Sequence, residues 1–276
     1  MEILHQSPLD IFVLKVITTK DEMFMLCKPN GQDYAITVYD IKNMAEVKDV
    51  IPLPGIRPRG LAACAVSNCV YLLNRKEFHL ISVLCITKDA ENKFTISPWK
   101  NLWLPNPTIS VTVDGSLILS RQRWGNLAVI SIYNASGSLQ RQLKLSWDIS
   151  SFSDLIPKPN GNIVLISVNN EYRKKLTEVD MKGSILRQYK SSISEYKGVT
   201  QADVYGRILI TDRLNRIELL DSEFNLLDCA GPQPYKEKLI SPYKLHYNSE
   251  RNEIVSFIEG SADERSVLTI FHFTEE

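Results

Sequence analysis

Short apolar segments recur at a nearly constant spacing along the chain. They begin at Met23, Val70, Leu117, Ile163, Ile208 and Ile254. Consecutive starts are separated by 47, 47, 46, 45 and 46 residues. The segments are rich in β-branched residues, and their apolar positions repeat every second residue, which predicts β-strands rather than helices. The sequence therefore predicts a β-repeat with a period of about 46 residues.

Each repeat contains four predicted strands, here lettered a to d. A polar turn precedes most of the recurring segments, for example Asp114–Ser116 and Asn160–Asn162. Asp-Gly and Asn-Gly favour hairpin turns because they tolerate a positive φ. A second β-rich segment follows, as at Ile36, and then a more polar strand, as at Leu139 and Ile185. Four antiparallel strands per repeat are typical of a β-propeller blade.

Six repeats fill the chain, so we expect an all-β, six-bladed propeller in a single domain over residues 1–276. The expected blades span residues 11–56, 57–105, 106–151, 152–196, 197–240 and 241–273. The last repeat supplies three strands before the chain ends, and residues 1–9 are expected to add its outer strand. That pairing would close the ring, remove a free sheet edge and hold both termini.

The fifth repeat resembles a known family. Its segment ILITDRLNRIELLDSEFNLL, from Ile208 to Leu227, is similar to an NHL repeat, which runs strand, Asp, short Asn/Arg loop, Arg-Ile, strand, Asp, turn and strand. The resemblance implies a six-bladed propeller like those at the C-terminus of tripartite-motif proteins, which bind RNA or proteins. It also implies a possible kinship with six-bladed lactonases. A shared fold does not transfer a function, so the site must be argued from its own residues.

Composition narrows the function classes. Apolar residues make up 44% and charged residues 23% of the chain, so disorder is not expected. Lys+Arg and Asp+Glu are both 32, which gives no global attraction to DNA or to a membrane. No apolar run reaches the roughly 18 residues that cross a bilayer, and the N-terminus does not resemble a secretion signal. We therefore expect a cytoplasmic protein.

The five cysteines show no metal-site spacing. Cys64 and Cys69 could meet across a hairpin, so a disulfide is conceivable, but buried thiols are expected in a cytoplasmic chain. The four histidines are scattered, and no nucleophile elbow or phosphate-binding loop is present, so we expect no cofactor, no metal and no catalytic residue. A calcium-assisted lactonase is the enzymatic alternative. It would draw on residues such as Asp154, Asn160 and Asp203, whose ordinary interpretation is that they form turns and cap strands.

The distribution of charge suggests where a partner would bind. In a propeller the b–c and d–a loops share one face and the a–b and c–d loops share the other. Assigning loops in this way makes the b–c/d–a face basic and the opposite face acidic. The four tryptophans Trp99, Trp103, Trp124 and Trp147 also fall in or beside loops of the basic face, although half or more of them are expected to pack between blades as core.

We expect this face to bind a protein partner without catalysis. The residues predicted to form the site are Arg75, Lys76, Arg121, Arg123, Trp124, Tyr172, Arg173, Arg213 and Arg216. Arginine and aromatic residues are enriched at protein–protein hot spots. The same combination suits single-stranded RNA, whose phosphates need cations and whose bases need flat rings, so RNA remains the alternative partner.

Overall fold

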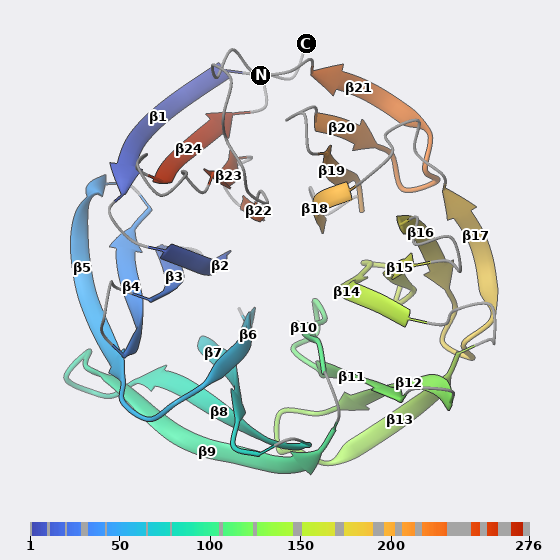
Figure 1. Cartoon of the computed structure of the whole chain (residues 1–276), viewed down its shortest axis with the longest axis horizontal. Helices are drawn as coiled ribbons and strands as arrows, with labels where there is room; N and C mark the ends of the chain where they lie inside the picture. The colour runs from blue at the N-terminus through green and yellow to red at the C-terminus, as the bar shows by residue number, and fades with distance from the viewer. Residues whose placement is uncertain are drawn as a thin grey trace. The chain divides into compact units, whose positions relative to one another are not determined.

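The structure is a computed structural model of the chain. It describes residues 2–9, 12–19, 21–28, 33–41, 43–64, 66–77, 79–104, 107–123, 126–145, 151–168, 174–189, 196–201, 206–212, 217–230, 244–248, 253–258 and 266–272. Within these residues the chain forms 24 β-strands, which pair into six four-stranded antiparallel sheets (Figure 1). The prediction of an all-β propeller arrangement with four antiparallel strands per blade is confirmed.

Five of the sheets use four consecutive strands each. In chain order, the first sheet comprises β2 (Phe12–Thr18), β3 (Glu22–Lys28), β4 (Tyr34–Asp40) and β5 (Asn43–Leu53). The second comprises β6 (Pro58–Cys64), β7 (Cys69–Arg75), β8 (Leu80–Lys88) and β9 (Phe94–Trp103). The third comprises β10 (Ile109–Val111), β11 (Leu117–Arg123), β12 (Asn126–Tyr133) and β13 (Leu139–Lys144). The other two are β14 (Ser151–Pro157), β15 (Ile163–Val168), β16 (Lys174–Val179) and β17 (Ile185–Tyr189); and β18 (Tyr196–Gln201), β19 (Ile208–Asp212), β20 (Ile217–Leu220) and β21 (Leu226–Ala230).

The sixth sheet is composite, because it joins the two ends of the chain. Its strands are β22 (Lys244–Asn248), β23 (Glu253–Ile258), β24 (Ser266–His272) and the N-terminal β1 (Glu2–Leu9). Strand β1 pairs antiparallel with β24, from Glu2 opposite His272 to Leu9 opposite Ser266. The N-terminal segment thus supplies the outer strand that the last repeat lacks, as the sequence predicts.

The chain divides into two compact units, each with three sheets. The first unit combines Met1–Pro54 with Ile193–Glu276, and the second spans Gly55–Ser192. In the first unit β22 contacts both β2 and β18, and in the second β10 contacts both β6 and β14. In each unit, therefore, the first strands of neighbouring sheets lie side by side, as propeller blades require.

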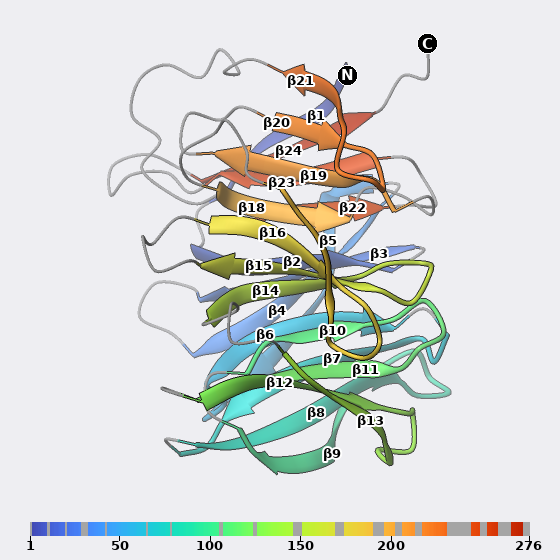
Figure 2. The same cartoon turned by 90° about the vertical axis from the view of Figure 1, so that its right-hand side faces the viewer.

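The c–d turns repeat one local geometry. In four of them the side-chain oxygen of an Asp or Asn accepts a hydrogen bond from the backbone N–H four residues later, at 2.8–2.9 Å. These pairs are Asp89 with Lys93, Asn134 with Ser138, Asp180 with Ser184 and Asp221 with Asn225. The residue before the last in each turn has a positive φ, and in two turns it is Gly137 or Gly183. The turns visible between β12 and β13 and between β16 and β17 in Figure 2 are of this kind.

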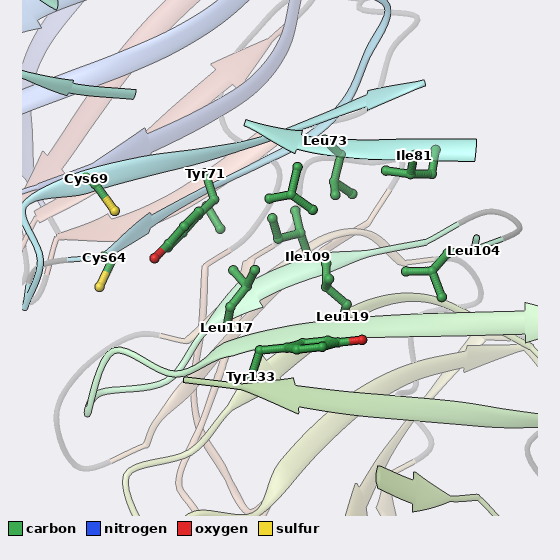
Figure 3. Packing of buried hydrophobic residues seen from close by; sticks show 12 residues of the cluster. Cys64, Cys69, Tyr71, Leu73, Ile81, Leu104, Ile109, Leu117, Leu119 and Tyr133 are labelled. Carbon is green, nitrogen blue, oxygen red and sulfur yellow. The ribbon is translucent and has the colours of Figure 1, made fainter. Parts of the chain in front are cut away.

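The core lies between neighbouring sheets. The cluster between β6–β9 and β10–β13 contains Tyr71, Leu73, Leu117, Leu119 and further apolar side chains, all nearly inaccessible to solvent (Figure 3). Burying one such leucine stabilises the fold by about 1.5–3 kcal/mol. In the part of the chain that the structure describes, no helix is long and apolar enough to cross a membrane.

Candidate functional site

The described part of the predicted partner face lies at one edge of sheet β6–β9. Arg75 ends β7, and Lys76 begins the tight turn to β8, where its backbone N–H donates to the Leu80 carbonyl at 3.0 Å. The Arg75 backbone N–H donates to the Arg57 carbonyl at 2.9 Å, which brings the start of β6 beside the turn. Arg57 and Lys76 are exposed and Arg75 is half-buried. Three cations from two loops therefore share this edge.

An exposed indole lies at the same edge. Trp103 ends β9, opposite Leu80 of β8, and 60% of its surface is exposed. Its ring centroid is 5.9 Å from that of His79, with the two planes tilted by 56°. The next residue, Leu104, is buried, and its N–H donates to the His79 carbonyl at 2.9 Å. The chain is thus anchored directly behind the tryptophan, so that the exposed ring stands on a fixed backbone.

A buried amide supports the cations from below. Asn74 is 8% exposed, and its Oδ1 accepts the backbone N–H of Arg57 at 3.0 Å. A buried hydrogen bond of this kind contributes about 0.5–1.5 kcal/mol and holds the loop before β6 against β7. We call the surface formed by Arg57, Arg75, Lys76, His79 and Trp103 the cationic edge. It offers positive charge and a flat apolar ring at once, the combination that binds acidic segments with an apolar anchor.

The structure places only part of the predicted site. Arg75 and Lys76 lie together in the cationic edge. The backbones of Arg121 and Arg123 form the end of β11, and their side chains are not among those that the structure describes. The remaining predicted residues lie outside the described residues: Trp124, Tyr172, Arg173, Arg213 and Arg216.

Trp99 is one of the tryptophans that pack between sheets, as expected for some of the four, and it contributes no ring to the partner face. Trp99 lies within the outer strand β9, where its Nε1 donates to the Ala135 carbonyl at 3.1 Å. Its ring meets those of Tyr71 and Tyr133 edge-on, at centroid distances of 5.5 and 6.0 Å. The neighbouring Lys100 donates to the Gly137 carbonyl and lies 4.8 Å above the Tyr133 ring. Both side chains therefore join sheet β6–β9 to sheet β10–β13 instead of facing a partner.

Sequence reasoning missed His79 and Asn74 as parts of the site. His79 stood out in the sequence only as one of four scattered histidines. Its position beside Trp103 follows from the register that pairs Leu80 with Trp103 across β8 and β9. A repeat period of about 46 residues does not determine that register, because β-bulges shift it within a strand pair, as happens between Val83 and Leu84.

The residues suggested for a lactonase centre are engaged in local structure where they are described. Asp154 Oδ1 accepts the N–H of Leu155 at 2.9 Å, and Asn160 Oδ1 accepts that of Asn162 at 3.0 Å. Asp203 lies outside the described residues. Among the residues that the structure describes, no group of three or more His, Cys, Asp or Glu is placed to hold a metal ion.

A cavity of about 500 Å³ lies between sheets β10–β13 and β14–β17, at their a–b turns. Its polar lining is satisfied internally. Thr112 Oγ1 donates to Asp114 Oδ1, which holds the pKa of that carboxyl below its ordinary value, and Ser116 Oγ donates to Gln140 Oε1 at 3.3 Å. Lys158, another lining residue, is bonded to Glu178. These polar side chains are already hydrogen-bonded to protein groups, so the cavity offers a ligand few hydrogen-bond partners.

Comparisons with known proteins support the fold alone. No family model matches the chain, and no curated protein matches it, so the NHL resemblance is not confirmed. In contrast, 1055 chains of solved structures match, so this fold is too widespread to identify a function. One is Raptor from Chaetomium thermophilum, with a TM-score of 0.61 and 12% sequence identity. The match covers 100% of this chain and 29% of that one, so the chain spans less than a third of that protein's length.

Proposed function

We propose that this chain is a non-catalytic interaction module that binds a protein partner through the cationic edge. The observation that carries the proposal is an anchored tryptophan, 60% exposed, beside the cations Arg57, Arg75 and Lys76. Trp and Arg are among the side chains that contribute most at protein interfaces, and here they lie together at one edge of a sheet. The proposed partner carries an acidic segment with at least one apolar side chain that packs on Trp103.

We propose further that the six sheets close into one six-bladed ring of NHL type. In such a ring each of the five sheets of consecutive strands, and the composite sheet of β1 with β22–β24, would form one blade. The fifth repeat supports the NHL assignment, because β19 ends at Asp212, β20 spans Ile217–Leu220 and Asp221 opens the turn to β21. Such a ring would bring the other predicted residues, including Arg121 and Arg213, to the same face as the cationic edge.

A protein partner suits the described surface better than RNA does. Binding of single strands uses several aromatic rings on which successive bases stack. The cationic edge offers one exposed indole, that of Trp103. The exposed acid Glu77 lies in the same turn as Lys76. A carboxylate there repels the phosphates that every nucleotide of RNA carries, whereas a protein segment can place a hydrogen-bond donor opposite Glu77 and its acidic residues opposite the cations. We place the interaction in the cytoplasm, in agreement with the free thiols of Cys27, Cys64, Cys69 and Cys85.

The test compares two surface variants with the unmodified chain. The first combines Arg57→Glu, Lys76→Glu and Trp103→Ala, which reverses two exposed charges and removes the ring. The control combines Lys93→Glu and Arg141→Glu, two exposed cations that lie on the β8–β9 turn and on β13, respectively. Each immobilised protein is incubated with nuclease-treated cell extract, and the retained proteins are quantified by mass spectrometry. In parallel, mixed-sequence single-stranded RNA is titrated at 50 and 200 mM salt.

We expect a set of proteins that the unmodified chain and the control retain and the cationic-edge variant loses, with equal melting temperatures for all three. Identical retained proteins in all three would overturn the proposal. Tight RNA binding that falls steeply with salt and is lost in the cationic-edge variant would replace the protein partner with RNA. We expect no lactone hydrolysis in the presence of calcium, and turnover abolished by a chelator would contradict the non-catalytic assignment.

A further inference from the structure

Three cysteines lie on one face of sheet β6–β9. Cys64 of β6 and Cys69 of β7 are directly opposite each other in the register. Tyr71 follows two residues after Cys69, on the same face, and lies opposite Cys85 of β8. Because alternate residues of a strand share a face, all three thiols point toward sheet β10–β13. Figure 3 shows Cys64, Cys69 and Tyr71 gathered at one end of this core.

Cys69 lies between the other two cysteines in the register, opposite Cys64 and diagonal to Cys85. Its interaction with each of them raises the pKa of Cys64 and lowers the pKa of Cys85. Ser67 Oγ also lies 3.0 Å from Cys69 Sγ. Cys69 is therefore the middle member of the three.

The two possible pairs differ in how well they fit a disulfide. Directly opposite residues of antiparallel strands have Cα atoms about 4.5–5.5 Å apart, within the range of about 4.4–6.8 Å that disulfides use. Cys64 and Cys69 are such a pair. Cys69 and Cys85 are diagonal neighbours, at about 7–8 Å in such sheets, where a bridge strains the backbone. A disulfide is therefore relaxed between Cys64 and Cys69 and strained between Cys69 and Cys85.

The thiol that solvent reaches most easily does not belong to the pair with the better disulfide geometry. Cys64 and Cys69 are 1% and 3% exposed, and burial contributes to raising the pKa of each thiol. Cys85 is half-buried, and its interaction with Cys69 lowers the pKa of its thiol, which favours the thiolate. A thiolate is the reactive form of cysteine. Cys85 thus combines access with reactivity, whereas the pair with the better disulfide geometry is closed to solvent.

We infer that these cysteines form a thiol relay in which a small-molecule disulfide, such as oxidised glutathione, oxidises Cys64 and Cys69 to an intramolecular disulfide through Cys85. The Cys85 thiolate attacks one sulfur of the oxidant, forms a mixed disulfide and releases one thiolate of the reagent. Cys69 loses its proton and attacks the Cys85 sulfur, which releases the second thiolate. Cys64 then loses its proton and attacks Cys69, and Cys85 leaves as a thiolate. Two protein thiols are oxidised and one reagent disulfide is reduced to two thiols.

The disulfide would alter the packing against the neighbouring sheet. In the reduced chain the Cys64 thiol contacts the Gly115 carbonyl at 3.9 Å, and Gly115 lies in the Thr112–Ser116 turn before β11. A Cβ added at Gly115 would lie 3.3 Å from Cys64 Sγ and 3.1 Å from Val66 Cβ, so this contact is tight. Redirecting the Cys64 sulfur toward Cys69 removes a contact with that turn. This device is separate from the cationic edge and does not depend on the proposed function.

The test oxidises the purified full chain with graded ratios of oxidised to reduced glutathione. The readouts are intact mass, where a disulfide loses two hydrogen atoms, and peptide mapping of the bridge. Cys85→Ser removes the first thiol and Cys64→Ser removes the last. Cys27→Ser is the control, because Cys27 is a buried thiol on β3 that bonds to the Ala35 carbonyl and Thr37 Oγ1.

We expect the unmodified chain and Cys27→Ser to form the Cys64–Cys69 bridge at the same rate. Cys85→Ser should form the same bridge about tenfold or more slowly, because the oxidant then has to reach a buried thiol. Cys64→Ser should accumulate the Cys69–Cys85 bridge or the Cys85 mixed disulfide. The relay is overturned if the unmodified chain yields only glutathione adducts, bridges a different cysteine pair, or reacts no faster than Cys85→Ser. Because Cys85 is half-buried, its variant carries the test even if Cys64→Ser does not fold.

Discussion

Sheets β14–β17 and β2–β5 contain the same kind of ion pair in two environments. In β14–β17, Glu178 is completely buried, and its Oε2 meets Lys158 Nζ at 3.0 Å and Arg187 Nε at 3.1 Å. In β2–β5, Glu22 meets Lys48 Nζ at 2.7 Å, and 42% of the lysine side chain is exposed. The first group links β16 to β17 and to the turn between β14 and β15, and the second links β3 to β5 across β4.

From the difference between these pairs we expect burial, and not distance, to determine how strongly the loss of one partner destabilises the fold. The Glu22–Lys48 pair, called the exposed pair after its lysine, has the shorter distance, yet water reaches the lysine side chain, screens the pair and solvates the ammonium if Glu22 is removed. The buried pair gains little over an apolar replacement, but the loss of one partner leaves a charge without solvent. Asn162 Nδ2 completes the buried site by donating to Glu178 Oε1 at 2.7 Å. The buried pair is therefore where a single substitution should destabilise most.

The largest effect is expected from Glu178→Ala. This substitution leaves the Lys158 ammonium, whose side chain is 3% exposed, without its carboxylate, which should lower the free energy of unfolding by about 3–5 kcal/mol. Urea unfolding followed by tryptophan fluorescence and circular dichroism measures the change. The matched control is Glu91→Ala, which removes the partner of Lys93 from a pair exposed by 73–74% and should cost less than about 1 kcal/mol. Equal costs for both substitutions would refute the argument from burial.

The next largest effect concerns two turns of the same sheet, one packed and one open. Gly183 and Gly161 have φ values of +88° and +87°, so alanine is strained at either by about 1–2 kcal/mol. A Cβ at Gly183 would also lie 2.4 Å from the Lys144 carbonyl oxygen of β13, whereas at Gly161 it meets nothing within 4 Å. We expect Gly183→Ala to cost about 1–3 kcal/mol more than Gly161→Ala in the same urea experiment. If the two variants unfold at the same denaturant concentration, the turn does not pack against Lys144 as described.

The turns also show how far the sequence predicts this fold. Asp-Gly and Asn-Gly pairs predict hairpins because the chemistry that sets them lies within four residues, as at Asp114 and Asn160. Phe224, with a φ of +69°, occupies the position that glycine holds elsewhere, and no local signal marks it. The segment Leu176–Val179 predicts a strand, but its Glu178 has the pattern of a solvent-facing residue. Lys158 from the β14–β15 turn and Arg187 from β17 neutralise that carboxylate in the interior, a contact that periodicity does not encode.

For the candidate site, too, local patterns predict some features, whereas others depend on long-range packing. The sequence predicts that cations gather near strand ends, and Arg75 and Lys76 do so. It does not separate Trp103, which is exposed, from Trp99, which packs on Tyr71 and Tyr133, because both fall near the end of the same polar strand. Which side of an outer strand faces the neighbouring sheet depends on the position of that sheet. Local patterns therefore locate the strands, and long-range packing decides which of their side chains can bind a partner.

A smaller effect is expected from Lys48→Met in the exposed pair. The hydrogen bond to Glu22 raises the pKa of Lys48 above its ordinary 10.5, against the opposing effect of burial. The stability that this pair adds, below about 1 kcal/mol, is fully present below pH 10.5 and is lost as the pH rises through the raised pKa. The unfolding free energies of the variant and the unmodified chain should thus differ at pH 7 and converge at high pH. A difference that grows with pH would contradict this sign.

The smallest effect compares two turns whose hydrogen-bond acceptor is a carboxylate in one and a neutral amide in the other. The N–H groups of Ser184 and Lys182 donate to Asp180 Oδ1, at 2.9 and 2.8 Å, and lower the pKa of that carboxyl from its ordinary 3.8. In the corresponding turn of β10–β13 the neutral amide oxygen of Asn134 accepts the N–H of Ser138 at 2.8 Å. A group with a lowered pKa stabilises the fold above its ordinary pKa, and that contribution is lost as the pH falls through the lowered value. Acidification should therefore weaken the turn at Asp180 and leave the turn at Asn134 unchanged.

Nuclear magnetic resonance separates the two turns directly. The amide proton shift of Ser184 should titrate with the Asp180 carboxyl, below pH 3.8, while that of Ser138 stays constant. Asp180→Asn should abolish the titration and keep the turn, because the amide oxygen can accept the same two hydrogen bonds. If Ser138 titrates along with Ser184, acid is loosening both sheets together and the effect does not arise from the Asp180 carboxylate. If neither titrates, that carboxylate does not hold the turn, and the burial of Gly183 against Lys144 is what fixes its conformation.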